Sequence, residues 1–174
     1  MRLRGGPDED NSVADNSVAV GLGEVKVSDN PLEILVAYGL GSCVAVAMYD
    51  PVARVAGLLH AVLPYNLNGT EALSAKYVDS GIAVLLHKLA EAGASRQRLI
   101  VRMAGGANML VAPGFNATLN IGERNVAAAH ATLATYKLKI KSEDVGGHTG
   151  RTVRLFVADG RMTVRVLGSQ EREL

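Results

Sequence analysis

The pattern of apolar and polar residues predicts a run of strands in the first part of the chain. Residues 24–28 alternate between polar and apolar, and longer apolar runs follow at 32–38, 43–49 and 54–63. Glycine, proline or aspartate separates these runs, as is typical of strands joined by turns. Strands in close succession are usually antiparallel neighbours, so we expect that arrangement for the three longer runs.

Two later segments show the spacing of amphipathic helices. Apolar residues recur every three or four positions from Val78 to Leu89, and Ser74 has the character of a helix N-cap, so we expect a helix from there to about residue 92. Asp79 is then a helix-start charge. Residues 121–125 open an alanine-rich segment with the same spacing, which predicts a second helix.

Strands are predicted again between and after the two helices. Short β-branched or apolar runs cover residues 98–103, 139–145, 153–158 and 162–167. The Asp-Gly pair at 159–160 is a strong signal for a hairpin turn. This mixture of strand and helix segments indicates an α/β domain.

The first 21 residues differ in composition from the rest. They are rich in Gly, Pro, Asp, Asn and Ser, and the segment Asp-Asn-Ser-Val-Ala occurs twice, at 10–14 and 15–19. Such a composition buries little apolar surface and is typical of flexible tails. We expect a flexible N-terminal tail over residues 1–21 and a single domain over residues 22–174, a length that can bury a substantial core.

Composition and charge exclude several classes of protein. Hydrophobic residues make up 48% of the chain and charged residues 20%, which is a globular composition. The net charge is +1, the basic residues are scattered and aromatic residues are only 4%, so no nucleic-acid surface is expected. The single cysteine precludes an internal disulfide, and no apolar run approaches the ~20 residues that a membrane helix needs. We therefore expect a cytoplasmic protein that does not insert into membranes.

The only cysteine, Cys43, occupies a position that suits a nucleophile. It ends the glycine-spaced segment GLGSC and directly precedes an apolar strand, and His60 lies in the next strand. A thiol needs a neighbouring base to supply thiolate at neutral pH, and an imidazole on an adjacent strand would serve. Backbone N–H groups of Gly41, Ser42 and Val44 in such a turn would hold a developing oxyanion. The alternative is a small buried cysteine beside a core histidine, which spacing alone leaves open.

Five separated motifs resemble those of the CheD family, the chemoreceptor glutamine deamidases of bacterial and archaeal chemotaxis. The motifs are GLGSC at 39–43 with an apolar strand ending in Asp-Pro at 50–51, GLLH at 57–60 followed by Leu-Pro at 63–64, GGAxM at 105–109, IGxRN at 121–125 and DxGGxxGR at 144–151. Their order is that of the family. The resemblance covers residues 23–168, and five motifs together are far more specific than any one of them.

The resemblance implies both a fold and a function. The fold is a layered α-β-β sandwich with mixed, largely antiparallel sheets and two long outer helices. The function is deamidation of selected glutamines of methyl-accepting chemotaxis receptors, with Cys43 as nucleophile and His60 as base through a thioester, and without a cofactor or metal. In many chemotaxis systems CheD proteins bind a CheC-type phosphatase of the response regulator, so a chain that serves mainly as that phosphatase's partner is the alternative.

One position departs from the family pattern. CheD proteins usually carry a threonine six residues before the cysteine, completing a Cys-His-Thr set, and this chain has Ala37. The role of orienting the imidazole is then vacant or taken by another group. If the hydroxyl is what is missing, Ala37→Thr should raise the rate about ten-fold. Such a departure would also suit the alternative function.

Other polar residues have simpler interpretations. A zinc site formed by Cys43, His60 and a further histidine is the less favoured alternative, because no two ligands have the short spacing of a metal motif. Asn108 is expected to be a turn residue, and Arg124 and Asn125 are expected to fix the geometry at the start of the second helix.

Overall fold

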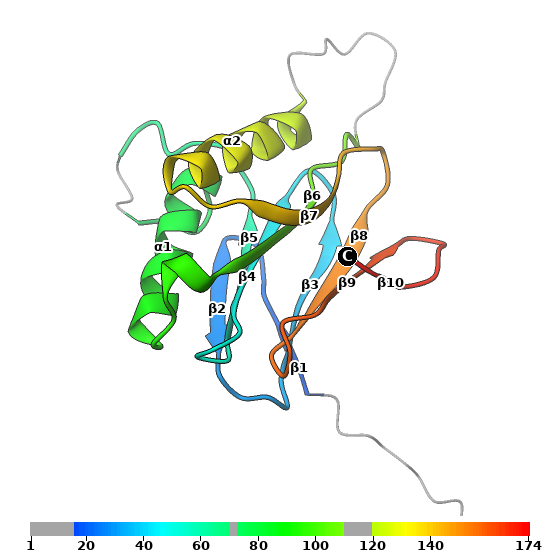
Figure 1. Ribbon diagram of the computed structural model, residues 1–174. Coiled ribbons are helices and arrows are strands. Elements are labelled where there is room, and N and C mark those ends of the chain that lie inside the picture. The colour runs from blue at the N-terminus through cyan, green and yellow to red at the C-terminus, as the bar shows by residue number, and fades with distance from the viewer. Residues whose placement is uncertain (1–15, 70–72, 110–119) are drawn as a thin grey trace, which may run out of the picture.

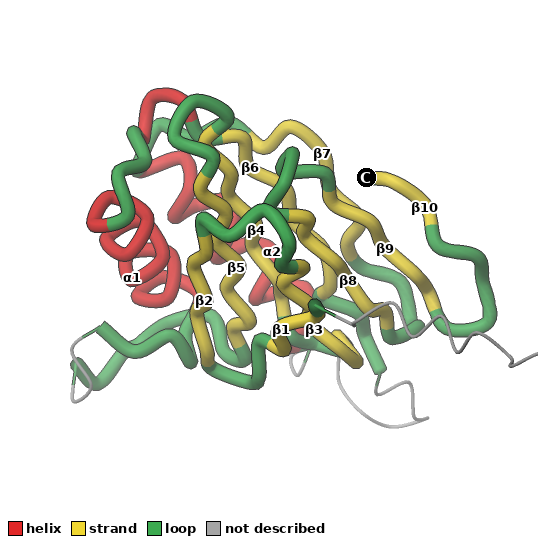
Figure 2. The backbone as a smooth tube through the Cα atoms, turned by 90° about the horizontal axis from the view of Figure 1, so that it is seen from below, coloured by secondary structure: helices red, strands yellow, loops and turns green. Residues whose placement is uncertain are grey.

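Two β-sheets lie face to face in the computed structural model, which describes residues 16–69, 73–109 and 120–174 (Figures 1 and 2). The open sheet contains, in spatial order, β1 (Ser17–Ala19), β3 (Ile34–Leu40), β8 (Arg151–Phe156), β9 (Met162–Val166) and β10 (Arg172–Glu173). The central sheet contains, in spatial order, β2 (Glu24–Ser28), β5 (Val55–Ala61), β4 (Val44–Asp50), β6 (Ile100–Gly105) and β7 (Ile140–Val145).

Two helices, α1 (Val78–Glu91) and α2 (Ile121–Thr135), cover the side of the central sheet that faces away from the open sheet (Figure 1). A single 3₁₀ turn at Arg96–Arg98 leads into β6. The order of layers is helices, central sheet, open sheet, which confirms the predicted α-β-β sandwich. No helix in the described part of the chain has the length and apolar character needed to cross a membrane.

Strand pairing is mixed and largely antiparallel, as predicted. β1 pairs with β3 and β6 with β7 in parallel. The other strand pairs within the described residues are antiparallel. The strands expected from the apolar pattern lie within two residues of their predicted bounds.

Burial explains why the strands differ in sequence pattern. Every residue of β4 and β5 is buried, because layers cover the central sheet on both faces. Such strands are continuously apolar. In β8, buried residues alternate with partly exposed ones, because the open sheet is covered on one face only.

The side chains of the central sheet divide the core into two layers. On β4, the side chains facing the helices are Val44, Val46 and Met48. The side chains facing the open sheet are smaller over most of the strand and include Cys43, Ala45 and Ala47. The cysteine therefore lies at the end of a row of small residues between the two sheets.

The open sheet corrects two predictions. Ser17–Ala19 fall in the range predicted to be a flexible tail, and for these residues the prediction was wrong, because they pair with β3 as strand β1. Residues 1–15 lie outside the described residues. β3 is also not the neighbour of β4 that their succession suggested. The chain changes sheet between these two strands, and β3 pairs with β8 instead.

The start of α1 corrects a third prediction. The helix begins at Val78, and its N-cap residue is Tyr77, three positions after the predicted cap Ser74. The Ser74 hydroxyl instead accepts a hydrogen bond from the backbone N–H of Lys76 at 3.2 Å, within the loop. Serine favours such local loop contacts as readily as helix caps, so the residue type alone did not distinguish them. Helix α2 begins at the predicted residue, and the Asn120 side chain caps it.

Candidate active site

The chain crosses from the open sheet to the central sheet in the turn that ends at Cys43. Each carbonyl of this turn accepts a hydrogen bond. The carbonyls of Gly41 and Cys43 accept from backbone N–H groups of residues 106–107, both at 2.8 Å. The carbonyl of Ser42 accepts from the side chain of Asn125, also at 2.8 Å. Three donors from two other segments therefore hold the backbone around the thiol.

This arrangement depends on glycine at the end of β6. Gly105 has a φ of +110°, and a Cβ built on it would lie 2.2 Å from the carbonyl oxygen of Cys43. A residue with a side chain would have to displace the cysteine backbone. Gly122 allows a similar close approach, because a Cβ there would lie 2.4 Å from the carbonyl oxygen of Ala107. Helix α2 thus rests directly on the segment that holds the turn.

Cys43 and His60 lie on the face of the central sheet that is turned toward the open sheet. His60 is opposite Ala45 in the β4–β5 ladder. Alternate residues of a strand share a face, so Cys43 is the diagonal neighbour of His60. Diagonal neighbours are within reach of a long side chain, and the register therefore allows thiol and imidazole to meet. Cys43 keeps 9% of its surface exposed and His60 only 2%, which makes the thiol the more accessible group.

A backbone carbonyl orients the His60 ring. Nδ1 lies 2.9 Å from the carbonyl oxygen of Val20. Because a carbonyl can only accept, Nδ1 must carry the proton, and in the neutral ring Nε2 then carries the lone pair. Nε2 is buried and has no hydrogen-bond partner among the described residues. The lone pair is thus available to a proton donor on the same face.

Burial favours the uncharged forms of both groups. It raises the pKa of the Cys43 thiol, against a smaller lowering effect of the residue's own backbone N–H. It lowers the pKa of His60 below 6.5, against smaller effects of the Val20 carbonyl and the negative charge of Glu24. At neutral pH both groups are therefore in their neutral forms, and a proton would leave the thiol only when the sulfur attacks.

The backbone N–H groups at the turn differ in whether another backbone group accepts from them. Those of Gly41, Ser42 and Cys43 have no backbone acceptor within the described part of the chain. Val44, in contrast, lies in the ladder between β5 and β6, where its N–H is used in strand pairing. Of the predicted oxyanion donors, Val44 is therefore used by the sheet, whereas Gly41 and Ser42 lack a backbone acceptor among the described residues, as does Cys43.

A glycine-rich loop lies beside the turn. The backbone N–H of Asn108 donates to the carbonyl of Gly147 at 2.8 Å, and the carbonyl of Asn108 lies 3.0 Å from Nδ1 of His148. Asn108 thus lies in a turn-like segment, as expected. A cavity of about 280 Å³ adjoins these residues and Glu123, next to the segment that holds the cysteine backbone.

The DxGGxxGR motif closes this loop with an ion pair. Arg151 donates to the carboxylate of Asp144 and to the carbonyl of Gly146. The guanidinium is almost fully buried, and the pair joins β7 of the central sheet to β8 of the open sheet. The first and last residues of the motif, Asp144 and Arg151, therefore fix the position of the glycine-rich loop beside the turn.

Several candidate residues lie elsewhere. His87 pairs with Glu91 on α1 at 3.3 Å, and His130 of α2 pairs with Glu143 at 3.0 Å, so neither joins Cys43. No cluster of three His, Cys, Asp or Glu suited to a metal occurs in the described ranges. Ala37 is fully buried in the core between the sheets.

Asp79 and Arg98 belong to structural contacts. The carboxylate of Asp79 accepts from the backbone N–H groups of Ser80, at 2.7 Å, and of Asn66, at 3.1 Å, at the start of α1. Arg98 binds the buried carboxylate of Asp50 at 2.7 Å, at the end of β4 opposite to Cys43.

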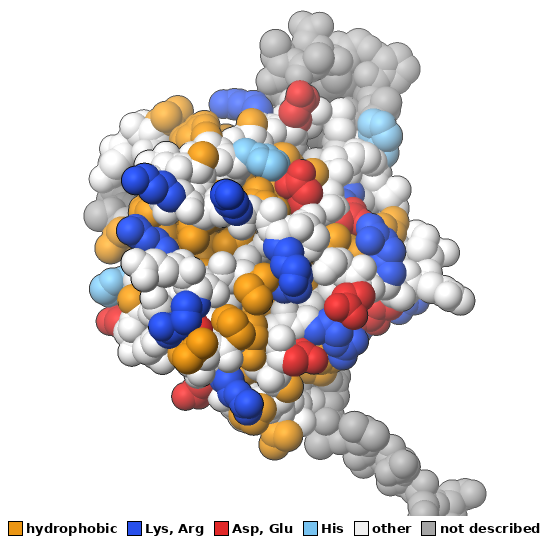
Figure 3. Space-filling model, viewed as in Figure 1, with side chains coloured by type: hydrophobic (Ala, Val, Ile, Leu, Met, Phe, Trp, Pro, Cys, Tyr) orange, Lys and Arg blue, Asp and Glu red, His pale blue; other side chains and the backbone are white. Residues whose placement is uncertain are grey.

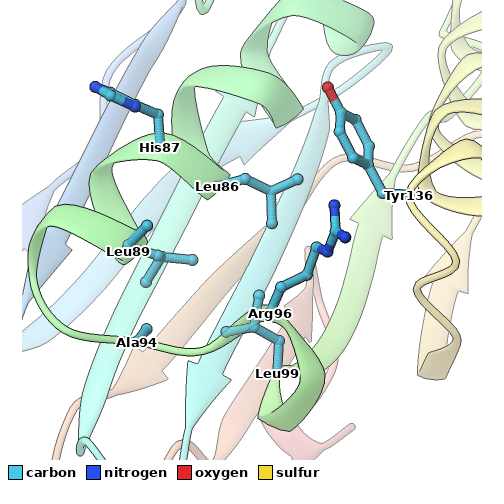
Figure 4. A pocket seen from close by; sticks show the side chains of 8 residues that line it. Leu86, His87, Leu89, Ala94, Arg96, Leu99 and Tyr136 are labelled. Atoms are coloured by element: carbon cyan, nitrogen blue, oxygen red, sulfur yellow. The ribbon is translucent and has the colours of Figure 1, made fainter.

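An apolar hollow on the helix side does not border the thiol. A cavity of about 310 Å³ lies between the end of α1, the following turn and the end of α2, and is lined by residues such as Leu86, Leu99 and Tyr136 (Figure 4). It adjoins the Asp50 end of β4, because the same turn contacts Asp50 through the N–H of Ser95. On this face Lys and Arg side chains are scattered among apolar and acidic ones (Figure 3).

Sequence reasoning missed two groups of the site. Val20, whose carbonyl binds His60, lies in the range predicted to be a flexible tail, and a backbone acceptor leaves no trace in the sequence. Asn125 was expected only to fix the start of α2, but its side chain reaches the turn before Cys43. The place of Asn125 in the IGxRN motif at 121–125 is the signal that could have pointed to this contact.

Comparison with known proteins finds one family and close relatives. Residues 62–166 match the family described as CheD chemotactic sensory transduction. A protein of Symbiobacterium thermophilum named "Probable chemoreceptor glutamine deamidase CheD" is 49% identical over 158 residues, which is 90% of this chain and 96% of that protein.

Two further relatives have similar coverage. One from Caldanaerobacter subterraneus, with the same name, is 42% identical over 86% of this chain and 92% of its own length. One from Thermotoga maritima, named "Chemoreceptor glutamine deamidase CheD", is 39% identical over 88% of this chain and 94% of its own length.

Proposed function

This chain belongs to the CheD family, and from that premise we propose that it is a glutamine deamidase of methyl-accepting chemotaxis receptors, acting in the cytoplasm. Its relatives carry the name of this activity, and the matches cover nearly the whole length of those relatives. The single observation that carries the proposal is the His60 ring. Its Nδ1 is held by the Val20 carbonyl, and its Nε2 is buried and unpartnered on the face that carries Cys43.

Catalysis begins with a proton transfer. The Cys43 thiol gives its proton to Nε2 of His60 as the sulfur attacks the side-chain carboxamide carbon of a receptor glutamine. The π electrons of the carbonyl move to its oxygen, and the backbone N–H groups of Gly41, Ser42 and Cys43 would bind the resulting oxyanion. The attack converts a neutral pair into an anionic adduct and an imidazolium, and these opposite charges stabilise one another in the buried site.

Ammonia leaves in the second step. His60 gives its proton to the departing nitrogen, the C–N bond breaks, and a thioester to Cys43 remains. The neutral His60 next takes a proton from water, which attacks the thioester carbon. The C–S bond breaks, the thiol regains its proton from His60, and the receptor side chain leaves as glutamate.

The Val20 carbonyl fills the orienting role that Ala37 leaves vacant. It holds the imidazole in one tautomer throughout, and it stabilises the imidazolium when that forms. We therefore propose that the absence of a threonine hydroxyl at position 37 does not disable the pair. The alternative, a chain that acts mainly as the partner of a CheC-type phosphatase, stays a prediction, since no observation on this structure favours it.

Each turnover changes the charge of a receptor helix. A neutral glutamine side chain becomes a carboxylate, which adds repulsion between packed acidic helices and creates a site for methylation. The test is to incubate the protein with the cytoplasmic fragment of a chemotaxis receptor, and to measure ammonia release and the mass of receptor peptides. We expect equal amounts of ammonia and glutamate at a few sites. A fragment whose glutamines are already glutamate is the matched control and should release none; no reaction with either fragment would overturn the proposal.

A further inference from the structure

We propose that Asn125 is a positioning residue that holds the strand of Cys43 and the strand of His60 in register at the level of the thiol. This inference rests on the proposed function, because it assigns a role in the same reaction. Asn125 lies on α2, outside both strands, and its side chain is fully buried.

One side-chain amide binds both strands. The Nδ2 group of Asn125 donates to the carbonyl of Ser42 at 2.8 Å and to the carbonyl of Val62 at 2.9 Å. Ser42 immediately precedes Cys43, and Val62 follows His60 by two residues. Carbonyl oxygens only accept, so the amide nitrogen must face them, and the orientation of the carboxamide is determined.

These two hydrogen bonds lie where the ladder between β4 and β5 ends. Val44 pairs with Ala61, and a continued ladder would pair Ser42 with Leu63. Leu63 is instead engaged elsewhere: its N–H donates to the carbonyl of Lys76 at 3.1 Å, and its carbonyl accepts from Val78 at 2.8 Å. β5 has turned toward α1 at this point. The Asn125 amide therefore replaces the missing rung.

The missing rung matters because Cys43 lies directly beside it, between the absent Ser42–Leu63 pair and the last ladder pair, Val44–Ala61. Extending the register by one residue from the Val44–Ala61 pair places Cys43 opposite Val62, one step beyond the last ladder pair. A strand end is normally free to fray, and fraying here would change the distance between the thiol and the imidazole. Asn125 binds Ser42 before the cysteine on one strand and Val62 opposite the cysteine on the other, and so fixes that distance.

The helix that carries Asn125 is itself fixed against the same turn. Gly122, one helical turn earlier, touches the backbone of residues 106–107, which in turn bind the carbonyls of Gly41 and Cys43. The backbone of α2 at Gly122 therefore packs against residues 106–107, and these residues bind the same turn that the Asn125 side chain binds.

Asparagine at this position is unfavourable for folding in two ways, which argues against a merely structural role. Asparagine is a poor helix former, and the Oδ1 atom of Asn125 is buried without a partner in the described residues. An unpaired buried acceptor opposes folding. A buried apolar residue would avoid both costs, but it could not donate to two carbonyls.

The test uses two variants and one control on the same helix. Asn125→Asp keeps the shape but removes both donors, and Asn125→Ala removes them without adding charge. Asn120→Asp adds the same charge at the helix start, where the residue accepts from the N–H of Glu123 and an aspartate can cap equally well. Folding is checked by circular dichroism and thermal unfolding, and deamidation is measured on a receptor fragment that the wild type converts.

The second readout does not need a receptor. Alkylation of Cys43 by iodoacetamide over a range of pH reports the ease of removing the thiol proton. We expect both Asn125 variants to lose about 10- to 100-fold in kcat with KM within about two-fold, because misplacement acts on the proton transfer. We also expect their alkylation profiles to move to higher pH, while Asn120→Asp matches the wild type in both.

Three results would overturn the assignment. A folded variant with unchanged kcat and an unmoved alkylation profile would show that the register does not need the amide. A loss confined to KM would place Asn125 in receptor docking. Failure of both variants to fold would make it a structural residue. If Cys43 of the wild-type protein is alkylated normally but the protein does not deamidate the receptor fragment, that result would instead count against the proposed function.

Discussion

Replacing Gly105 by alanine should damage the site through the backbone of Cys43, and Gly93 provides the matched control. Both glycines have a left-handed backbone, with φ of +110° and +93°. An added Cβ at Gly93 meets nothing within 4 Å, whereas at Gly105 it lies 2.2 Å from the Cys43 carbonyl oxygen. The left-handed conformation costs alanine about 1–2 kcal/mol at either position. The steric conflict at Gly105 adds about 1–3 kcal/mol.

The two variants should therefore differ in stability and in activity. Urea denaturation should show Gly105→Ala to be less stable than Gly93→Ala by about 1–3 kcal/mol, or by roughly 2–12 °C in Tm. Gly105→Ala should also lose at least about ten-fold in kcat per folded molecule, because relief of the conflict moves the cysteine backbone. Gly93→Ala should keep the wild-type kcat. Equal destabilisation of the two variants, with full activity in both, would refute the close contact as a determinant of the site.

Three further predictions follow from the same geometry. The acid limb of the pH–rate profile for deamidation should be centred below the ordinary histidine value of about 6.5, because burial lowers the pKa of His60 and the protonated ring cannot accept the thiol proton; an acid limb centred above that value would contradict this. Asp50→Ala should lower the free energy of unfolding in urea by about 3 kcal/mol or more, since it leaves the part-buried N–H groups of Val52, Ala53 and Ser95 without their acceptor, and a loss below about 1 kcal/mol would be the contrary result. Ala37→Thr should change kcat by less than about three-fold, because the Val20 carbonyl already holds Nδ1; a ten-fold gain would show that the hydroxyl is needed after all.

Most of the fold could be read from local patterns. The continuous apolar runs of β4 and β5 and the helical spacing from Val78 to Leu89 arise from burial, which leaves a direct trace in the sequence. The layered arrangement came from the family resemblance. β1 was missed because its stability comes from pairing with β3. A strand of only three residues within a polar segment shows no periodic pattern of apolar residues.

The two central side chains of the candidate site can be picked out from the sequence. Cys43 and His60 stand out by residue type, and the glycine motifs around them mark close backbone approaches such as the one at Gly105. The groups that orient them do not stand out. The Val20 carbonyl is backbone, and the two bonds of Asn125 depend on where β5 leaves the ladder, which is a property of the folded chain.

The most direct test of the account is deamidation by the Cys43→Ala variant beside the wild type. The substitution removes the nucleophile and only a small buried volume, so the variant should fold normally by circular dichroism. With a receptor fragment that the wild type converts, we expect no ammonia release and no change in the mass of the receptor peptides. Ammonia release at a rate comparable to wild type, from a preparation of the variant alone, would contradict the central claim that the Cys43 sulfur attacks the glutamine.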